Sequence, residues 1–223
     1  MEHLLVKISI MLVPALLAVT VHEVAHGYVA DRFGDPTARL LNRLTLNPLR
    51  HLDIFGTIAL LLVGFGWAKP VPVNQSNLRN PHRHMLWVAI SGPVSNFMLA
   101  ALSALIVHFT GLLQQGVGME SITEPLMMMA AFSLYINVIL GVINMVPIPP
   151  LDGGRVLAAI LPPRYASTLM RLEPFGFFIV IGLIFFTDIW SSVVGPLVYA
   201  IVSMFASSHM QAVNSVIQFL FSR

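Results

Sequence analysis

The sequence contains no cysteine, and only 10% of its 223 residues are charged, whereas 57% are apolar. Without thiols the chain can form neither a disulfide framework nor a thiolate metal site, so metal ligands must come from histidine, aspartate or glutamate. A soluble domain carries about 25% charged residues. The low charge therefore excludes an ordinary soluble enzyme and a module that binds nucleic acid, and it indicates that a lipid bilayer is the main solvent.

The apolar residues form long runs that predict an all-α, multi-pass membrane protein. The apolar core of a bilayer is about 30 Å thick, so a helix needs roughly 20 residues to cross it. The runs that suggest crossings are 4–30, 85–112, 126–147, 174–188 and 189–206. A shorter run, 52–66, is expected to form a re-entrant or hairpin segment. We therefore predict about five to six transmembrane helices.

The basic residues predict how the chain is oriented in the membrane. Ten of the twelve lie in three blocks, which are Arg32, Arg39, Arg43 and Arg50; Lys69, Arg79 and Arg83; and Arg155, Arg164 and Arg171. Because loops rich in lysine and arginine stay in the cytoplasm, we expect residues 31–51 and 67–84 to lie inside and the N-terminus outside. The run 52–66 must then return to the side from which it left, and the C-terminus lies inside.

Two joints between the apolar runs are rich in proline and glycine, at residues 66–73 and 147–154. Proline removes a backbone donor and blocks the continuation of a helix. Non-helical backbone at membrane depth is tolerated only where it faces protein or a water-filled cavity. The two joints therefore predict a polar cavity in which chemistry could occur.

Three ionisable residues interrupt the first apolar run, in the motif HEVAH at residues 22–26. His22 and His26 are four residues apart, so they share a helix face and can bind one Zn²⁺. Glu23 lies one step around the helix, where it can accept a proton from water. Ionisable groups inside a span are costly and indicate function. The alternative is that the three side chains only satisfy one another between helices.

Catalytic zinc typically has three protein ligands and an open position, so a third ligand is required. Asp152 is the best candidate, because it follows a span and a proline-rich stretch, and because two glycines after it permit a close approach. The charge pattern also places Asp152 and His26 toward the same membrane face. The alternative role for Asp152 is to cap the N-terminus of a helix that begins near Gly153.

The ordered motifs resemble those of the site-2 protease family of intramembrane zinc metalloproteases, peptidase family M50. The resemblance covers about residues 14–165 and is closest to the short bacterial and archaeal members. The motifs are HEVAH (22–26), LNPLRHLDIFG (46–56), FGWAKPVPVN (65–74), SGPVSN (91–96) and NMVPIPPLDGG (144–154). No PDZ domain, which longer relatives carry, is expected.

The resemblance implies roles for individual residues. His22, His26 and Asp152 match the ligands of one zinc ion per chain, and Glu23 matches the general base. Asn96 and Asn144 match catalytic positions that hydrogen-bond substrate or an oxyanion; the alternative for both is hydrogen bonding between helices. Residues 66–74 match a membrane-associated strand that presents unfolded substrate, and the alternative is a proline-rich reversal of the chain.

The leading functional hypothesis is zinc-dependent cleavage of the transmembrane segments of single-span membrane proteins. Residues 1–223 would form one domain in the cell membrane, with a catalytic core over 4–165, C-terminal spans over 174–206 and the active site toward the cytoplasm. The C-terminal spans, the hairpin or a regulatory membrane partner would limit substrate access. The alternative is a protein that binds or transports metal without proteolysis, although few polar residues are available to line a transport route.

The orientation can be tested with introduced thiols, because the native chain has none. Thr45→Cys and Ser76→Cys should both react with a membrane-impermeant reagent from the cytoplasm, and Gly116→Cys should react from outside. Labelling of positions 45 and 76 from opposite faces would show that residues 52–66 cross the membrane completely.

Overall fold

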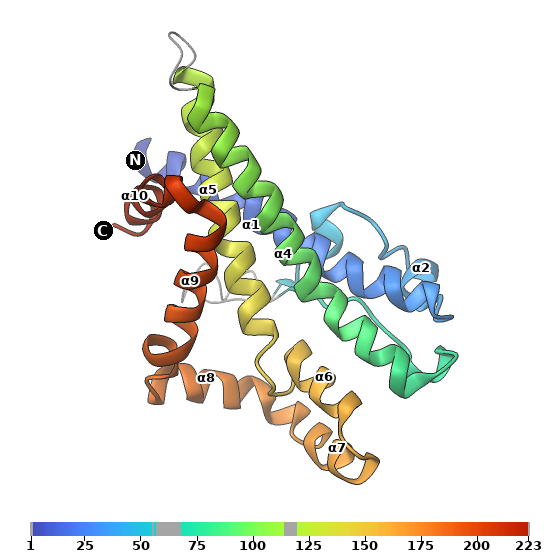
Figure 1. The fold of residues 1–223 in the computed structure, drawn as a ribbon. Coiled ribbons are helices and arrows are strands. Elements are labelled where there is room, and N and C mark those ends of the chain that lie inside the picture. Colours follow the sequence, from blue (N-terminus) through green and yellow to red (C-terminus); the bar gives the residue numbers. More distant parts are fainter. Residues whose placement is uncertain (1, 55, 57–67, 114–119, 223) are drawn as a thin grey trace. The chain divides into compact units, whose positions relative to one another are not determined.

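The computed structural model describes residues 2–54, 56, 68–113 and 120–222, and the chain is mainly helical within them (Figure 1). The α-helices are α1 (Glu2–Arg32), α2 (Thr37–Leu40), α4 (Pro81–Leu113), α5 (Glu120–Asn144), α6 (Asp152–Ile160), α7 (Pro163–Met170), α8 (Gly176–Phe186), α9 (Gly195–Ala206) and α10 (Met210–Phe221). Shorter turns are η1 (Pro48–Arg50), η2 (Gln75–Asn77), η3 (Glu173–Phe175), η4 (Trp190–Val194) and η5 (Ser207–His209). The predicted all-α class is confirmed.

Four helical stretches of the described residues are long and apolar enough to cross a membrane. They are Leu5–Arg32, Pro81–Leu113, Ser121–Asn144 and Trp190–Phe221. The predicted span at 174–188 is not confirmed, because α8 has 11 residues and a helix of that length rises only about 16 Å. The last stretch is longer than predicted and changes direction at Ser207, where φ is 48°. The predicted count of five to six helices is thus not confirmed.

The predicted re-entrant segment at 52–66 falls largely outside the described residues and stays a prediction. The described residues that flank it meet, because Leu52 and Ala68 form an isolated antiparallel bridge and the Lys69 N–H donates to the His51 carbonyl at 2.8 Å. Beyond this bridge, the described residues contain no β-strand, and residues 69–74 are irregular and non-helical. The strand that the resemblance implies at 66–74 is therefore not confirmed in the part that the structure describes.

The chain divides into two compact units, and the prediction of a single domain is not tested by this division. Unit 1 consists of residues 1–18, 96–142 and 187–223, and unit 2 of residues 19–95 and 143–186. Helices α1, α4 and α5 each run from one unit into the other. All three blocks of basic residues, and every predicted site residue except Asn96, belong to unit 2.

Unit 1 packs its helices through small side chains and buried hydrogen bonds. Ala100, Ala104, Ala130 and Ala131 are buried, so α4 and α5 lack bulky side chains at these positions. The Ser103 hydroxyl donates to the Ser133 hydroxyl at 2.8 Å. Both features are typical of helix association in lipid, where close backbone packing replaces the hydrophobic effect.

Unit 2 is built around the C-terminal half of α1. Ala30 packs in a buried cluster with Leu78, Met85 and Val88, which come from the segment before α4 and from α4 itself. The three consecutive helices α6, α7 and α8 complete the unit. Prolines at 147, 149 and 150 prevent α5 from continuing, so a new helix, α6, begins at Asp152.

A buried carboxylate, Asp35, ties the loop after α1 to the segment that precedes α4. Its oxygens accept hydrogen bonds from the Thr37 hydroxyl, the Thr37 N–H at 3.1 Å, the Asn74 N–H at 2.6 Å and the Asn77 amide at 2.9 Å. Burial raises the pKa of Asp35, but these donors, Thr37 first, outweigh burial and hold the pKa below its usual value. Asp35 therefore positions the segment 69–74.

We predict that Asp35→Ala lowers the free energy of unfolding by roughly 2–4 kcal/mol, because several buried donors lose their acceptor. Because the folded-state pKa is the lower one, the stabilisation is complete above about pH 4 and is lost as the pH falls through the folded-state pKa. Chemical unfolding in detergent at several pH values measures both effects. Asp188→Ala, at an exposed aspartate, is the control; equal losses in the two variants would contradict this role.

Candidate metal centre and catalytic cavity

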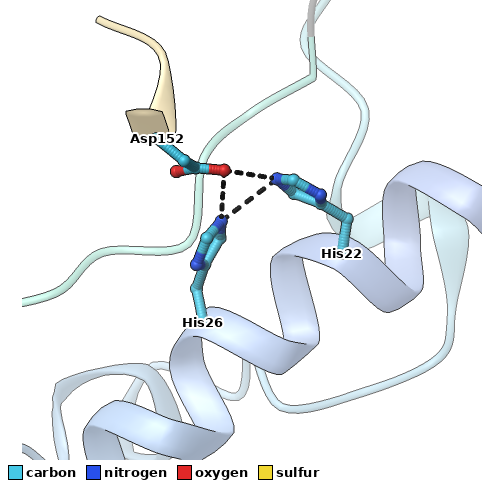
Figure 2. Close-up of side chains that lie close together, drawn as sticks. All are labelled: His22, His26 and Asp152. Atoms are coloured by element: carbon cyan, nitrogen blue, oxygen red, sulfur yellow. Dashed lines mark hydrogen bonds and ion pairs between the residues drawn. The ribbon is translucent and has the colours of Figure 1, made fainter. Parts of the chain in front are cut away.

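The structure brings three predicted ligands together, as Figure 2 shows. His22 and His26 project from the same face of α1 toward Asp152, the first residue of α6. The Asp152 Oδ2 atom lies 3.1 Å from His22 Nε2 and 3.3 Å from His26 Nε2. The two Nε2 atoms lie 3.1 Å from each other. Three donor atoms thus face one point, although His22 and Asp152 are 130 positions apart in the sequence.

These separations fit a tetrahedral zinc site. Donors that each lie about 2.0–2.1 Å from zinc at tetrahedral angles are about 3.3 Å apart. The observed separations of 3.1–3.3 Å match this value. Within the described residues, the buried Asp152 Oδ2 accepts no hydrogen bond of normal geometry, although both imidazoles lie beside it. A cation between the three atoms would satisfy all of them.

The Asp152 carboxyl is ionised in this environment. Burial raises its pKa, but the adjacent imidazoles of His22 and His26 lower it by more, so the pKa lies well below its usual value. Asp152 therefore presents a negative charge to the two histidines. An anionic oxygen beside two imidazole nitrogens is a donor set that suits zinc and other divalent ions.

A second contact orients His26. Its Nδ1 atom lies 2.7 Å from the carbonyl oxygen of Val88 on α4. A proton on Nδ1 donates this hydrogen bond and leaves the lone pair of Nε2 facing His22 and Asp152. This is the usual way in which a backbone carbonyl fixes the tautomer of a metal-binding histidine.

Two glycines allow the three elements to approach closely enough. A Cβ atom at Gly92 of α4 would collide with the imidazoles of both His22 and His26. A Cβ atom at Gly153 would collide with the carbonyl oxygens of Met145 and Val146, in the turn that leads to α6. Both glycines belong to motifs that are visible in the sequence, but the sequence alone does not show what they contact.

Glu23 lines the same cavity as the three predicted ligands, His22, His26 and Asp152. This cavity has a volume of about 330 Å³, and its walls include the three predicted ligands, Glu23, Asn144 and the segment around Val71. We name it the catalytic cavity, because it contains the predicted ligands and the predicted base. The Val71 N–H donates to Glu23 Oε2 at 2.7 Å. A backbone group of a non-helical segment therefore holds the predicted base, and no sequence motif indicated this contact.

The two predicted asparagines differ in position. Asn144 ends α5 and lines the catalytic cavity. Asn96 belongs to unit 1, where its fully buried side chain donates to the Ala18 carbonyl at 3.3 Å and to Asn137 Oδ1 at 2.8 Å. These bonds join α4 to α1 and α5, as the alternative reading of Asn96 expects. A substrate contact for either asparagine stays a prediction.

In the charge pattern, Arg155 is one of ten basic residues that form three blocks. The structure places it on α6, in the wall of the catalytic cavity, with Glu173 as its partner. Its position three residues after Asp152 could have indicated this, because residues i and i+3 lie on one helix face.

Comparisons with known proteins agree with the geometry. The family model of peptidase family M50 matches residues 10–187. The chain is 40% identical over 200 residues to the Bacillus subtilis protein named "Putative zinc metalloprotease YwhC". The matched region covers 85% of this chain and 86% of that protein. The chain is 28% identical over 174 residues to "Putative zinc metalloprotease Rip2" of Mycolicibacterium smegmatis, covering 76% of this chain and 64% of that protein.

A more distant similarity reaches an archaeal protein. The chain is 24% identical over 157 residues to "Zinc metalloprotease MJ0392" of Methanocaldococcus jannaschii, covering 70% of this chain but only 36% of that protein. No solved structure matches the chain significantly.

We predict that Gly92→Ala lowers the zinc content of the purified protein several-fold, because the added methyl group must displace the two imidazoles. Gly182→Ala is the matched control, since a Cβ atom at that position has no atom within 4 Å beyond its chain neighbours and the backbone of its own helix. Zinc per chain is measured by elemental analysis after dialysis. Equal zinc contents in the two variants would show that the approach of α4 to the histidines is not required for binding.

Proposed function

The chain belongs to peptidase family M50, and from this premise we propose that it is an intramembrane endopeptidase of the site-2 type. Family membership and the four apolar helices among the described residues support a multi-pass membrane protein, and the names of its relatives support a zinc metalloprotease. We propose further that it cleaves the transmembrane segments of single-span membrane proteins at the cavity around His22, His26 and Asp152. The proposed metal load is one zinc ion per chain.

One observation carries this proposal: a carboxylate that can act as a base lies in the same cavity as a metal-binding group, on a helix long enough to cross a membrane. When bound, zinc polarises a scissile carbonyl and makes a water molecule more acidic. His22, His26 and Asp152 would hold it with three donors, which leaves room for water and substrate.

Glu23 would move the proton. Its Oε2 atom is engaged by the Val71 N–H, which fixes the direction of the carboxylate and leaves Oε1 to accept a proton from the attacking water. The water oxygen bonds to the scissile carbon, the C–N bond breaks, and the proton passes from Glu23 to the departing amine. General acid–base transfer of this kind contributes typically 10²–10⁴ to the rate.

The segment 69–74 supports binding of substrate in an extended form. A transmembrane helix hides its peptide bonds in internal hydrogen bonds, so the substrate must unwind locally before cleavage. Pro70 and Pro72 have no N–H, and the N–H groups of Val71 and Asn74 are bound to Glu23 and Asp35. The segment would therefore mainly accept hydrogen bonds from the N–H groups of a substrate strand.

The proposed location is the cell membrane, with the active site toward the cytoplasm. The three basic blocks support this orientation, since all of them belong to the unit that contains the site and basic loops stay inside. We also propose that a regulatory membrane partner or the C-terminal helices control the access of substrate.

We predict that Glu23→Gln reduces cleavage of a single-span substrate by about 10²–10⁴ while zinc content is unchanged, because glutamine keeps the size of the side chain but cannot accept the proton. Zinc content and cleavage are measured on the same preparation. Glu124→Gln, at an exposed position on α5, is the control.

Asp152→Ala should lose both zinc and cleavage, which separates the ligand from the base. Full cleavage by Glu23→Gln would overturn the assigned mechanism. If neither the wild type nor the variants cleave any substrate, but the wild type moves zinc across liposomes, the metal-transport alternative replaces this proposal.

A further inference from the structure

A second cavity adjoins the catalytic cavity within unit 2. This side cavity has a volume of about 450 Å³ and includes Gln75, His82, Ala158, Ser167 and Met170 in its walls. Met85, Arg155 and Glu173 line both cavities. These three residues therefore form the wall that the cavities share.

The shared wall contains an ion pair. Arg155 Nη2 donates to Glu173 Oε1 at 2.9 Å, and the two side chains are 36% and 35% exposed. Water competes strongly with an ion pair of this exposure, so the pair contributes little to stability and can exchange partners. Arg155 has five N–H groups in a planar fork, and this is its one hydrogen bond within the described residues. The guanidinium can thus donate hydrogen bonds to another carboxylate.

The chain before α4 connects the two cavities. Pro70, Val71 and Val73 of the non-helical segment 69–74 line the catalytic cavity, and Gln75, the first residue of η2, lines the side cavity. A substrate strand that runs along this segment would pass from the predicted metal ligands toward Arg155 within a few residues.

The charges near the side cavity favour an acidic occupant. Arg155 is in the wall of the side cavity, and Arg164 and Arg171 follow it in sequence on or directly after α7, outside that wall. Glu173 is the single acidic residue between positions 153 and 186, and Asp152, at the start of α6, faces His22 and His26 instead. An arginine fork binds a carboxylate more strongly than it binds a neutral group. A basic side chain would meet Arg155 and be repelled.

We propose that the side cavity is a substrate subsite for an acidic side chain a few residues from the scissile bond. Arg155 is the residue that determines this specificity, and Glu173 is an internal carboxylate that occupies Arg155 until the substrate displaces it. This inference rests on the proposed function, because it names a preference of the same catalytic site.

The test compares single-span substrates that differ only in one residue, glutamate or glutamine, placed in turn at each position within about six residues of the cut. The measured quantity is the ratio of kcat/KM for the glutamate substrate to that for the glutamine substrate. At one or two positions, the wild type should give a ratio of about ten, as one charge-assisted hydrogen bond provides.

Variants then assign the preference to residues. Arg155→Gln should bring the ratio close to one, Arg155→Lys should retain part of it, and Glu173→Gln should raise it because the competing carboxylate is gone. Arg164→Gln, which removes an exposed arginine outside both cavity walls, should leave the ratio unchanged. Zinc content and melting temperature are measured for every variant and identify misfolded protein. If Arg155→Gln is misfolded, Arg155→Lys is the deciding variant.

The outcomes separate this inference from the proposed function. If the wild type cleaves the glutamine substrate but shows no preference at any position, or if Arg155→Gln keeps the preference, the subsite is overturned and the protease remains. If a purely structural ion pair were present, Glu173→Gln and Arg155→Gln would lower the cleavage of both substrates equally, which also overturns the subsite. If the wild type cleaves neither substrate, the proposed function and the subsite are both overturned.

Discussion

The approach of the Asp152 carboxylate to the imidazoles of His22 and His26 is the interaction on which the site depends. Burying an ionised carboxylate is costly unless positive or polar partners surround it. The two nitrogens lie 3.1 and 3.3 Å from the Asp152 Oδ2 atom, and a divalent cation held between the three atoms would supply such a partner. Several features of unit 2 permit this approach. Prolines end α5 before Asp152, and Gly153 lets α6 pack against the preceding turn. Gly92 lets α4 lie close to the two histidines.

A second set of polar contacts fixes the non-helical segment that faces this group. Arg43, although buried, donates to the Lys69 carbonyl at 2.8 Å, and the Lys69 N–H donates to the His51 carbonyl. Further along, Val71 binds Glu23 and Asn74 binds Asp35. Backbone that lacks regular hydrogen bonding needs such partners, because unpaired polar groups are expensive away from water. The same bonds that satisfy the segment therefore also aim the predicted base.

The polar residues of the two units serve different purposes. In unit 1, the side chains of Asn96, Asn137, Ser103 and Ser133 form hydrogen bonds between helices. In unit 2, the polar side chains line two cavities that share the Arg155–Glu173 pair. Ionisable groups in an apolar protein are thus concentrated where proton transfer and charge recognition would occur.

The sequence by itself determined the class of the protein and the chemistry of its centre. Hydropathy requires helices in lipid, and the four-residue spacing of His22 and His26 places both on one helix face, because these signals depend on composition and local periodicity. The sequence did not determine that α8 is too short to cross a membrane, that Asn96 forms hydrogen bonds to α1 and α5, or that Arg155 lines the catalytic cavity. The tertiary structure decided which distant groups meet: the Val71 N–H with Glu23, Val88 with His26, and Glu173 with Arg155. Such contacts depend on where prolines and glycines direct the backbone, which no periodic pattern in the sequence encodes.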